Sequence, residues 1–141
     1  MSSQLNVDTI VDKAGSGGSN VKMANTSTYV SEGGAVTQNT VQGLIKCWVN
    51  IVGTGTAGFR DSFNTSSFTD SGEGNATTNF TNNMSNDDFA APVGGQDTSQ
   101  RSNVHTSFEE QTTSTLRIMH FENGSALDCT RIGAIVAGDL A

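Results

Sequence analysis

The stretch Ile45-Lys46-Cys47-Trp48-Val49-Asn50-Ile51 places an apolar side chain at every odd-numbered position. Successive side chains of a β-strand point to opposite faces of a sheet, so these odd-numbered residues would share one face. Lys46, Trp48 and Asn50 would share the other face. The turn sequence Gly53-Thr54-Gly55-Thr56 then ends the pattern. The stretch therefore predicts a strand of a β-fold with one face in the core.

A second alternating stretch is Thr115-Leu116-Arg117-Ile118-Met119-His120-Phe121. Leu116, Ile118 and His120 would share one face of this strand. Asn123-Gly124-Ser125 follows, and Asn-Gly is the strongest short-range signal of a β-hairpin. The run from Thr130 to Gly138 is apolar enough for a strand in the middle of a sheet.

Shorter segments between these two stretches are separated by turn sequences. Ser71-Gly72-Glu73-Gly74-Asn75 contains two glycines able to adopt a positive φ, and it predicts a hairpin between 66–70 and 76–81. Pro92 is expected at a strand edge or outside a strand, Gly94–Asn103 as a loop, and Val104–Phe108 as a strand. Short strands with a turn signal about every ten residues predict an all-β fold, an antiparallel, jelly-roll-like β-sandwich.

The composition agrees with a β-fold rich in turns. Nearly half of the 141 residues are Ser, Thr, Asn or Gly, whereas charged residues make up only 15%. Intrinsic disorder would come with dense charge or abundant Pro, and this chain has one Pro and well-spaced Phe, Ile and Val residues. We therefore expect a folded domain with a small core, for which oligomerisation is a standard source of additional burial.

The net charge argues against one class of partner. The chain has 14 Asp and Glu against 7 Lys and Arg, which gives a formal net charge of -7. This sign opposes binding to a phosphate backbone, so no nucleic-acid partner is expected. The sequence also has no run of about 20 apolar residues and no basic-then-apolar leader, so we expect neither membrane insertion nor secretion.

The residue types that most often carry chemistry show no arrangement typical of an active site or a metal site. Cys47 and Cys129 lie in apolar runs and are expected to be buried free thiols. His105 and His120 have no Cys, His or carboxylate at metal-ligand spacing, so each is expected to be a sheet residue with one hydrogen bond. We expect no enzymatic activity, no cofactor and no metal.

Trp48, the single tryptophan, leaves two interpretations open. An exposed indole can stack on a sugar ring, which would make Trp48 a glycan contact. A place in the core or in a subunit interface is more common where only 6% of the residues are aromatic. We favour the core or interface position and keep the glycan contact as the alternative.

The N-terminal part of the chain has a different organisation. Residues 5–12 alternate apolar and polar side chains, and the Gly/Ser-rich residues 14–20 follow them. A single strand cut off by a flexible linker cannot bury its own face, so we expect it to dock on a neighbouring chain. The expected docking residues are Leu5, Val7, Thr9 and Ile10. The predicted organisation is an arm and hinge over 1–20, a connector of short strands and turns over 21–43, and the β-sandwich over 44–141.

Several segments together carry a family resemblance. They are Trp48-Val49-Asn50-Ile51-Val52-Gly53-Thr54-Gly55-Thr56, Phe59-Arg60-Asp61-Ser62-Phe63-Asn64, Ser67-Phe68-Thr69-Asp70 and Gly72-Glu73-Gly74. The combination resembles a motif common in structural proteins of tailed bacteriophages, notably aquatic and cyanobacterial ones. Asn79-Phe80-Thr81 is similar to the next strand of that family, Leu116-Arg117-Ile118 with Ile135-Val136 to its closing hairpin, and Leu5–Ile10 to its leader.

The resemblance implies a virion structural protein, made in the host cytoplasm and carried on the particle surface. A length of 141 residues suits a short fibre or a capsid-decorating protein better than a long tail fibre. We expect a homotrimer of β-sandwiches that docks on other virion proteins, of the capsid or the tail, through the N-terminal arm. The alternative is a host-receptor module of a tail fibre that binds surface glycans.

Overall fold

The computed structural model describes residues 28–30, 37–96 and 104–141, and the chain divides into two units, 1–41 and 42–141. In the first unit, the described residues form one antiparallel pair of short strands, β1 (Thr28–Val30) and β2 (Thr37–Asn39). The predicted docking residues Leu5, Val7, Thr9 and Ile10 lie outside the described residues.

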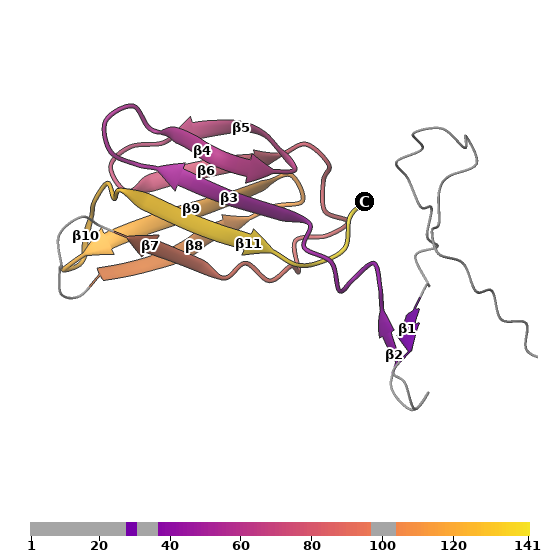
Figure 1. Ribbon diagram of the computed structural model, residues 1–141. Coiled ribbons are helices and arrows are strands. Elements are labelled where there is room, and N and C mark those ends of the chain that lie inside the picture. The colour runs from indigo at the N-terminus through magenta and orange to yellow at the C-terminus, as the bar shows by residue number, and fades with distance from the viewer. Residues whose placement is uncertain (1–27, 31–36, 97–103) are drawn as a thin grey trace, which may run out of the picture. The chain divides into compact units, whose positions relative to one another are not determined.

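The second unit contains a four-stranded antiparallel sheet in the order β4-β3-β11-β7 (Figure 1). The central strand β3 carries the alternating stretch on which the sequence prediction rests, and the C-terminal apolar run forms its central neighbour β11. The bounds are β3 (Cys47–Val52), β4 (Gly58–Phe63), β7 (Val93–Gln96) and β11 (Arg131–Val136).

A second antiparallel sheet lies behind the first one (Figure 1). Its strand β9 pairs with β6, β8 and β10, and β5 pairs with the far side of β6. The bounds are β5 (Thr65–Asp70), β6 (Asn75–Phe80), β8 (Val104–Gln111), β9 (Thr115–Glu122) and β10 (Ser125–Ala126). The described chain is thus all-β with antiparallel sheets, as expected of a β-sandwich.

The core lies between the two sheets, because the inward side chains of both form one hydrophobic cluster. Along β3, β6, β9 and β11 every second residue is buried, so each strand contributes one face. The largest fully buried side chains of the cluster are those of Ile51, Met84, Leu116, Ile118, Ile132 and Val136.

The connections differ from those of a jelly roll. Three consecutive pairs, β3–β4, β5–β6 and β8–β9, are hairpins within one sheet, whereas a jelly roll passes most consecutive strands between its sheets. The physical reason lies in short turns such as Ser71–Asn75, where Gly72 and Gly74 adopt positive φ values of 118° and 66°. The prediction of a hairpin at this position is confirmed.

The predicted faces of the two alternating stretches are largely confirmed. Cys47, Val49 and Ile51 are buried, as are Leu116, Ile118 and His120. The prediction is wrong at the start of the first stretch, where Ile45 is half exposed and Lys46 is buried. The main-chain N–H of Lys46 donates to Val136 O (2.9 Å) and its Nζ donates to Leu44 O (2.7 Å), so the chain enters the sheet at Lys46.

The expectation of a loop from Gly94 to Asn103 is wrong in its first part. Gly94, Gly95 and Gln96 belong to β7, which pairs with β11, and 97–103 lie outside the described residues. Glycine has a low strand propensity, so the polar, Gly-rich sequence did not indicate a strand here. Pro92 precedes β7, as expected, and β8 begins at the predicted Val104.

The two cysteines are buried thiols that are not joined by a disulfide, which confirms the sequence prediction. Cys47 begins β3, whereas Cys129 lies beside the other end of this strand, where Gly53 N–H donates to Cys129 O (3.0 Å). Across the described ranges, no helix has the length and apolar character needed to cross a membrane.

Candidate functional site

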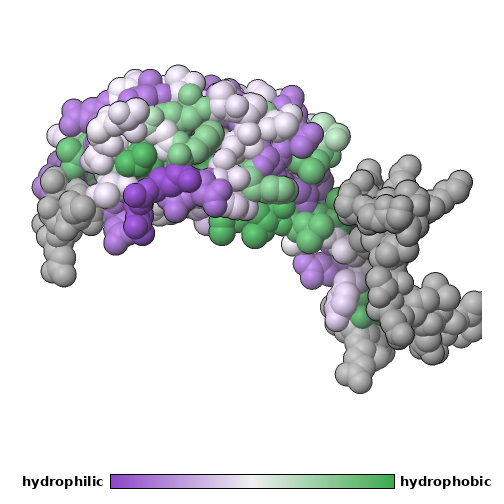
Figure 2. Space-filling view, turned by 45° about the horizontal axis from the view of Figure 1, so that its top comes forward, coloured by the Kyte–Doolittle hydropathy of each residue, from purple (hydrophilic) through white to green (hydrophobic). Residues whose placement is uncertain are grey.

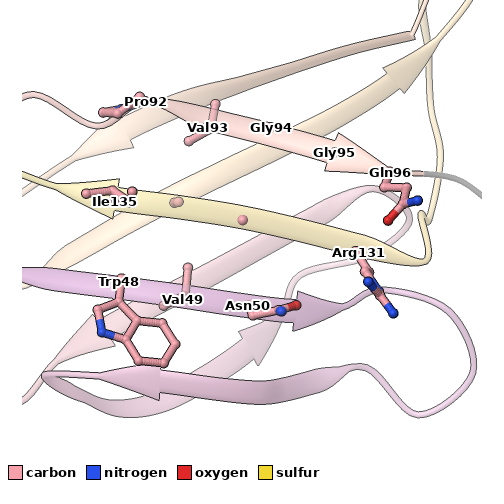
Figure 3. A pocket seen from close by; sticks show the side chains of 12 residues that line it. Trp48, Val49, Asn50, Pro92, Val93, Gly94, Gly95, Gln96, Arg131 and Ile135 are labelled. Atoms are coloured by element: carbon pink, nitrogen blue, oxygen red, sulfur yellow. The ribbon is translucent and has the colours of Figure 1, made fainter.

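The outer face of the sheet β4-β3-β11-β7 carries a groove (Figure 3). The strand register sets its shape. Residues that are in register across neighbouring strands form rows. The first row contains Trp48 and Ile135, and the next outward-facing row contains Asn50, Gly133 and Gly94. The third outward-facing row contains Arg131 and Gln96. These rows alternate with the buried rows of the same strands, so their side chains face outward. The groove has a volume of about 660 Å³.

Two glycines form the floor of the groove. Gly133 and Gly94 lie directly opposite each other on β11 and β7. A Cβ on Gly94 would meet no atom within 4 Å, and one on Gly133 would meet only Val49 O at 3.9 Å. Because neither glycine has a side chain, the sheet backbone is open at these two positions between the walls.

An apolar wall borders the floor on one side. Trp48 is half-buried on β3, and its register partner Ile135 is 43% exposed. Pro92 follows in the same row, since its carbonyl accepts a hydrogen bond from Ile135 N (3.2 Å). Figure 3 shows the indole of Trp48 beside β3, on the side away from the strand that carries Ile135. The wall thus offers an aromatic ring and aliphatic carbons at the surface.

Polar groups border the floor elsewhere. Asn50 lines the groove, and its Oδ1 is buried without a hydrogen-bond partner in the described part of the chain. Such an unpaired acceptor is costly, so a donor that reached it would be bound favourably. Arg131 and Gln96 lie side by side at the other end of the groove, and the Arg131 guanidinium has no ion pair with any described residue. Hydrogen-bonding groups therefore face an aromatic wall across an open floor.

This lining suits noncovalent binding of a small polar ring. Binding sites for small molecules combine apolar walls with a few placed polar groups, which is the pattern found here. The described part of the lining includes no carboxylate, thiol or imidazole. Within 28–30, 37–96 and 104–141, no group of three His, Cys, Asp or Glu is placed to hold a metal ion.

The two histidines occupy different environments. His120 is fully buried on β9, and its Nδ1 is 2.7 Å from Oγ1 of Thr106. His105 is exposed on β8. The sequence prediction of a sheet residue with a hydrogen bond is therefore confirmed for His120.

A second surface feature lies at the end of the sandwich where the chain enters β3. Leu44, Ile45 and Leu140 are 59%, 50% and 40% exposed, and we call these three residues the basal cluster. Leu140 pairs with the buried Met84, and Lys46 and Asp139 lie beside the cluster. Burial lowers the pKa of Lys46, and the carboxylate of Asp139 partly opposes this effect. Figure 2 shows hydrophobic side chains gathered in patches between hydrophilic ones on the visible face.

The sequence prediction found one residue of the groove and missed the others. Trp48 was singled out as a glycan or interface contact, and the alternation of 45–51 also placed Asn50 on its face. The contribution of β7 was missed because Gly94 to Gln96 was expected to be a loop. The signal that would have helped is the glycine at the centre of the apolar run 130–138, since glycine inside a strand marks a close approach.

Comparison of the chain with protein-family models, curated proteins and solved structures gives no match. The resemblance to structural proteins of tailed bacteriophages therefore stays a prediction from the sequence.

Proposed function

We propose that this chain is a bacteriophage virion structural protein, a short fibre or capsid-decorating protein that displays its β-sandwich on the particle as a homotrimer. The proposal combines the sequence resemblance with a fold of the expected class. Its N-terminal arm, with Leu5, Val7, Thr9 and Ile10, would dock on a capsid or tail protein by strand addition.

The observation that carries the proposal is the basal cluster. Leu44 and Ile45 are adjacent and each is half exposed or more, although the chain has few large apolar side chains to place in its core. Contiguous exposed apolar side chains of this kind mark contact surfaces. Packing of three copies through this end would bury the basal cluster and leave the faces of both sheets free.

The test is the solution mass of the purified protein, measured by light scattering. We expect a trimer for the wild type and a monomer for the double variant Leu44→Ser, Ile45→Ser. Phe108→Ser is the matched control, because Phe108 is equally exposed (47%) but lies on β8 in the other sheet. A monomeric wild type, or a double variant that keeps the mass of the trimer, would contradict the proposed assembly.

The arm is tested separately. A chain that lacks residues 1–18 should remain a trimer in solution and fail to join the particle. Normal incorporation of the truncated chain would contradict a docking role of the arm.

A second candidate function is favoured by the groove. A module that binds host-surface glycans would need an aromatic side chain at the surface beside hydrogen-bonding groups, and Trp48, Asn50 and Arg131 line the groove in this way. Display of such a module is compatible with the structural role, because the groove lies on a sheet face and the basal cluster at an end.

A further inference from the structure

We infer that the groove on the sheet β4-β3-β11-β7 is a saccharide site, in which a neutral hexopyranose ring lies on Gly133 and Gly94 and stacks against Trp48. This inference rests on the second candidate function and gives it a location, a ligand class and a floor.

The fold does not require glycine at either floor position. Both residues lie inside strands, where glycine weakens a sheet because it contributes no side-chain packing. Neither has a positive φ, and a Cβ would find free space at both positions. Glycine in a strand without a steric reason marks a place where a ligand or another backbone approaches closely.

Other glycines of the same sandwich show what a structural requirement looks like. A Cβ on Gly95 would lie 2.5 Å from Thr106 Oγ1, and one on Gly138 would lie 2.6 Å from Phe89 Cβ. Gly74 combines a positive φ with contacts to the main chain of His120 and Leu127. The packing therefore explains these three glycines. Gly94 and Gly133, like Gly58 at the start of β4, have no such requirement, and they differ from Gly58 because they lie opposite each other on neighbouring strands.

The walls of the groove match the chemistry of a pyranose ring. A pyranose has a face of C–H groups, which stacks on an aromatic ring, and a rim of hydroxyl groups, which donate and accept hydrogen bonds. Trp48 and Ile135 supply the apolar wall, and Gln96 and Arg131 supply donors at the opposite side. The unpaired Asn50 Oδ1 is an acceptor that a hydroxyl of the sugar would satisfy after rotation of the amide.

The charge of the chain and of the groove favours a neutral sugar. The chain carries a formal net charge of -7, and Asp61 lies opposite Asn50 in the same outward row. Among the residues that the structure describes, Arg131 is the single charged one that lines the groove. Arg131 and Asp61 thus offset each other, and the negative net charge of the whole chain disfavours the approach of a polyanionic glycan, so a neutral sugar fits the groove better.

The chain contains its own probe for the site. Trp48 is the only tryptophan, so any change in tryptophan fluorescence on titration reports on the groove wall. We would titrate the full chain to millimolar concentrations with maltohexaose, cellohexaose, mannohexaose and chitotetraose, and with oligogalacturonate as the acidic comparison. We expect saturable quenching or a spectral shift with at least one neutral oligosaccharide and none with oligogalacturonate.

The floor is tested by adding side chains to it. Gly133→Thr and Gly94→Thr should fold normally, since both positions have space and threonine favours strands, and should weaken binding of the responding sugar by about tenfold or more. Gly58→Thr is the matched control, because Gly58 is also a strand residue, has no atom within 4 Å of an added Cβ and does not line the groove. Calorimetry with Trp48→Ala should show loss of the same binding.

Three results would overturn the inference. One is the absence of a fluorescence response to every neutral oligosaccharide, and another is equal binding by Gly133→Thr and Gly58→Thr. The third is a fall in solution mass caused by Gly133→Thr, which would assign the groove to a second copy of the chain. Retention of the trimer by the basal variant, together with intact sugar binding, would instead contradict the proposed assembly and leave the saccharide site standing.

Discussion

Gly95 lies against the buried imidazole of His120, so closely that a Cβ on Gly95 would stand 2.6 Å from Nδ1 of the histidine. The same Cβ would also meet Thr106 Oγ1, the hydrogen-bond partner of that nitrogen. Gly94, the preceding residue of β7, points to the other face and has no atom within 4 Å of a Cβ. Two adjacent glycines of one strand thus have opposite steric surroundings.

This contrast predicts opposite effects of one substitution at neighbouring positions. Gly95→Ala should lower the free energy of unfolding by about 1–3 kcal/mol, because the methyl group overpacks a site with a hydrogen-bonded histidine. Gly94→Ala should be neutral or raise it by up to about 1 kcal/mol, since alanine restricts the unfolded chain. Urea unfolding of both variants checks the prediction, which fails if the two behave alike.

The chain passes from one sheet to the other between β4 and β5, and this corner predicts a second pair of effects on the free energy of unfolding. Asn64 lies between β4 and β5 and has a φ of 58°. Its Nδ2 donates to Lys46 O (2.9 Å), and its Oδ1 accepts from Asn82 N (2.8 Å). Asn64→Ala loses these bonds and also strains the left-handed backbone, so we expect a loss of about 2–3 kcal/mol. Asn64→Gly loses only the bonds and should be about 1 kcal/mol more stable than Asn64→Ala.

Thermal unfolding of both variants measures this difference. Equal stability of the alanine and glycine variants would show that the positive φ carries no cost. Greater stability of the alanine variant would contradict the assignment of Asn64 as a left-handed corner.

The parts of the fold that the sequence predicted are those set by local pattern. Burial of Val49 and Leu116 follows from alternation with period two within one strand, and the hairpin at Asn123 follows from a turn that requires positive φ. These signals do not depend on which strand lies next. They therefore indicated the class of fold and the inward faces of the longest strands.

The parts that the sequence did not predict depend on contacts between distant segments. Gly95 is in a strand because its backbone pairs with Ile132 of β11, and it lies against His120 of the other sheet; no local pattern encodes either contact. The groove likewise needs Gly94 to be in register with Gly133, thirty-nine positions along the chain. Trp48 alone was visible as a candidate, whereas the floor beside it arises from the sheet order.

The turn between β5 and β6 predicts unequal roles for two aspartates. Asp128 Oδ1 accepts a hydrogen bond from the buried Gly74 N (2.7 Å), while Asp70 Oδ1 accepts one from the exposed Gly72 N (3.1 Å). Asp128→Ala leaves a buried donor unpaired and should cost about 2 kcal/mol. Asp70→Ala lets water replace the carboxylate and should cost less than about 1 kcal/mol.

Urea unfolding measures both effects, and Asp128→Asn adds a useful control. The amide oxygen of this variant keeps an acceptor for Gly74 without the negative charge. We expect a loss between those of the two alanine variants. A loss from Asp70→Ala equal to that from Asp128→Ala would contradict the importance of burial at this turn.

The thiol of Cys47 predicts a loss of stability at alkaline pH. Burial raises the pKa of Cys47 from 9.0 to about 11, because the thiolate is poorly solvated in the core. The unfolded chain therefore releases this proton at lower pH than the folded chain. The resulting contribution of Cys47 to the free energy of unfolding is complete below pH 9 and is lost as the pH rises through 11, with an upper limit of about 2–3 kcal/mol.

Unfolding free energies of the wild type and Cys47→Ala, compared from pH 8 to 11, should converge as the pH rises. Because Lys46 is present in both proteins, its own titration cancels in the difference. A constant difference between the two proteins over this range would contradict the raised pKa.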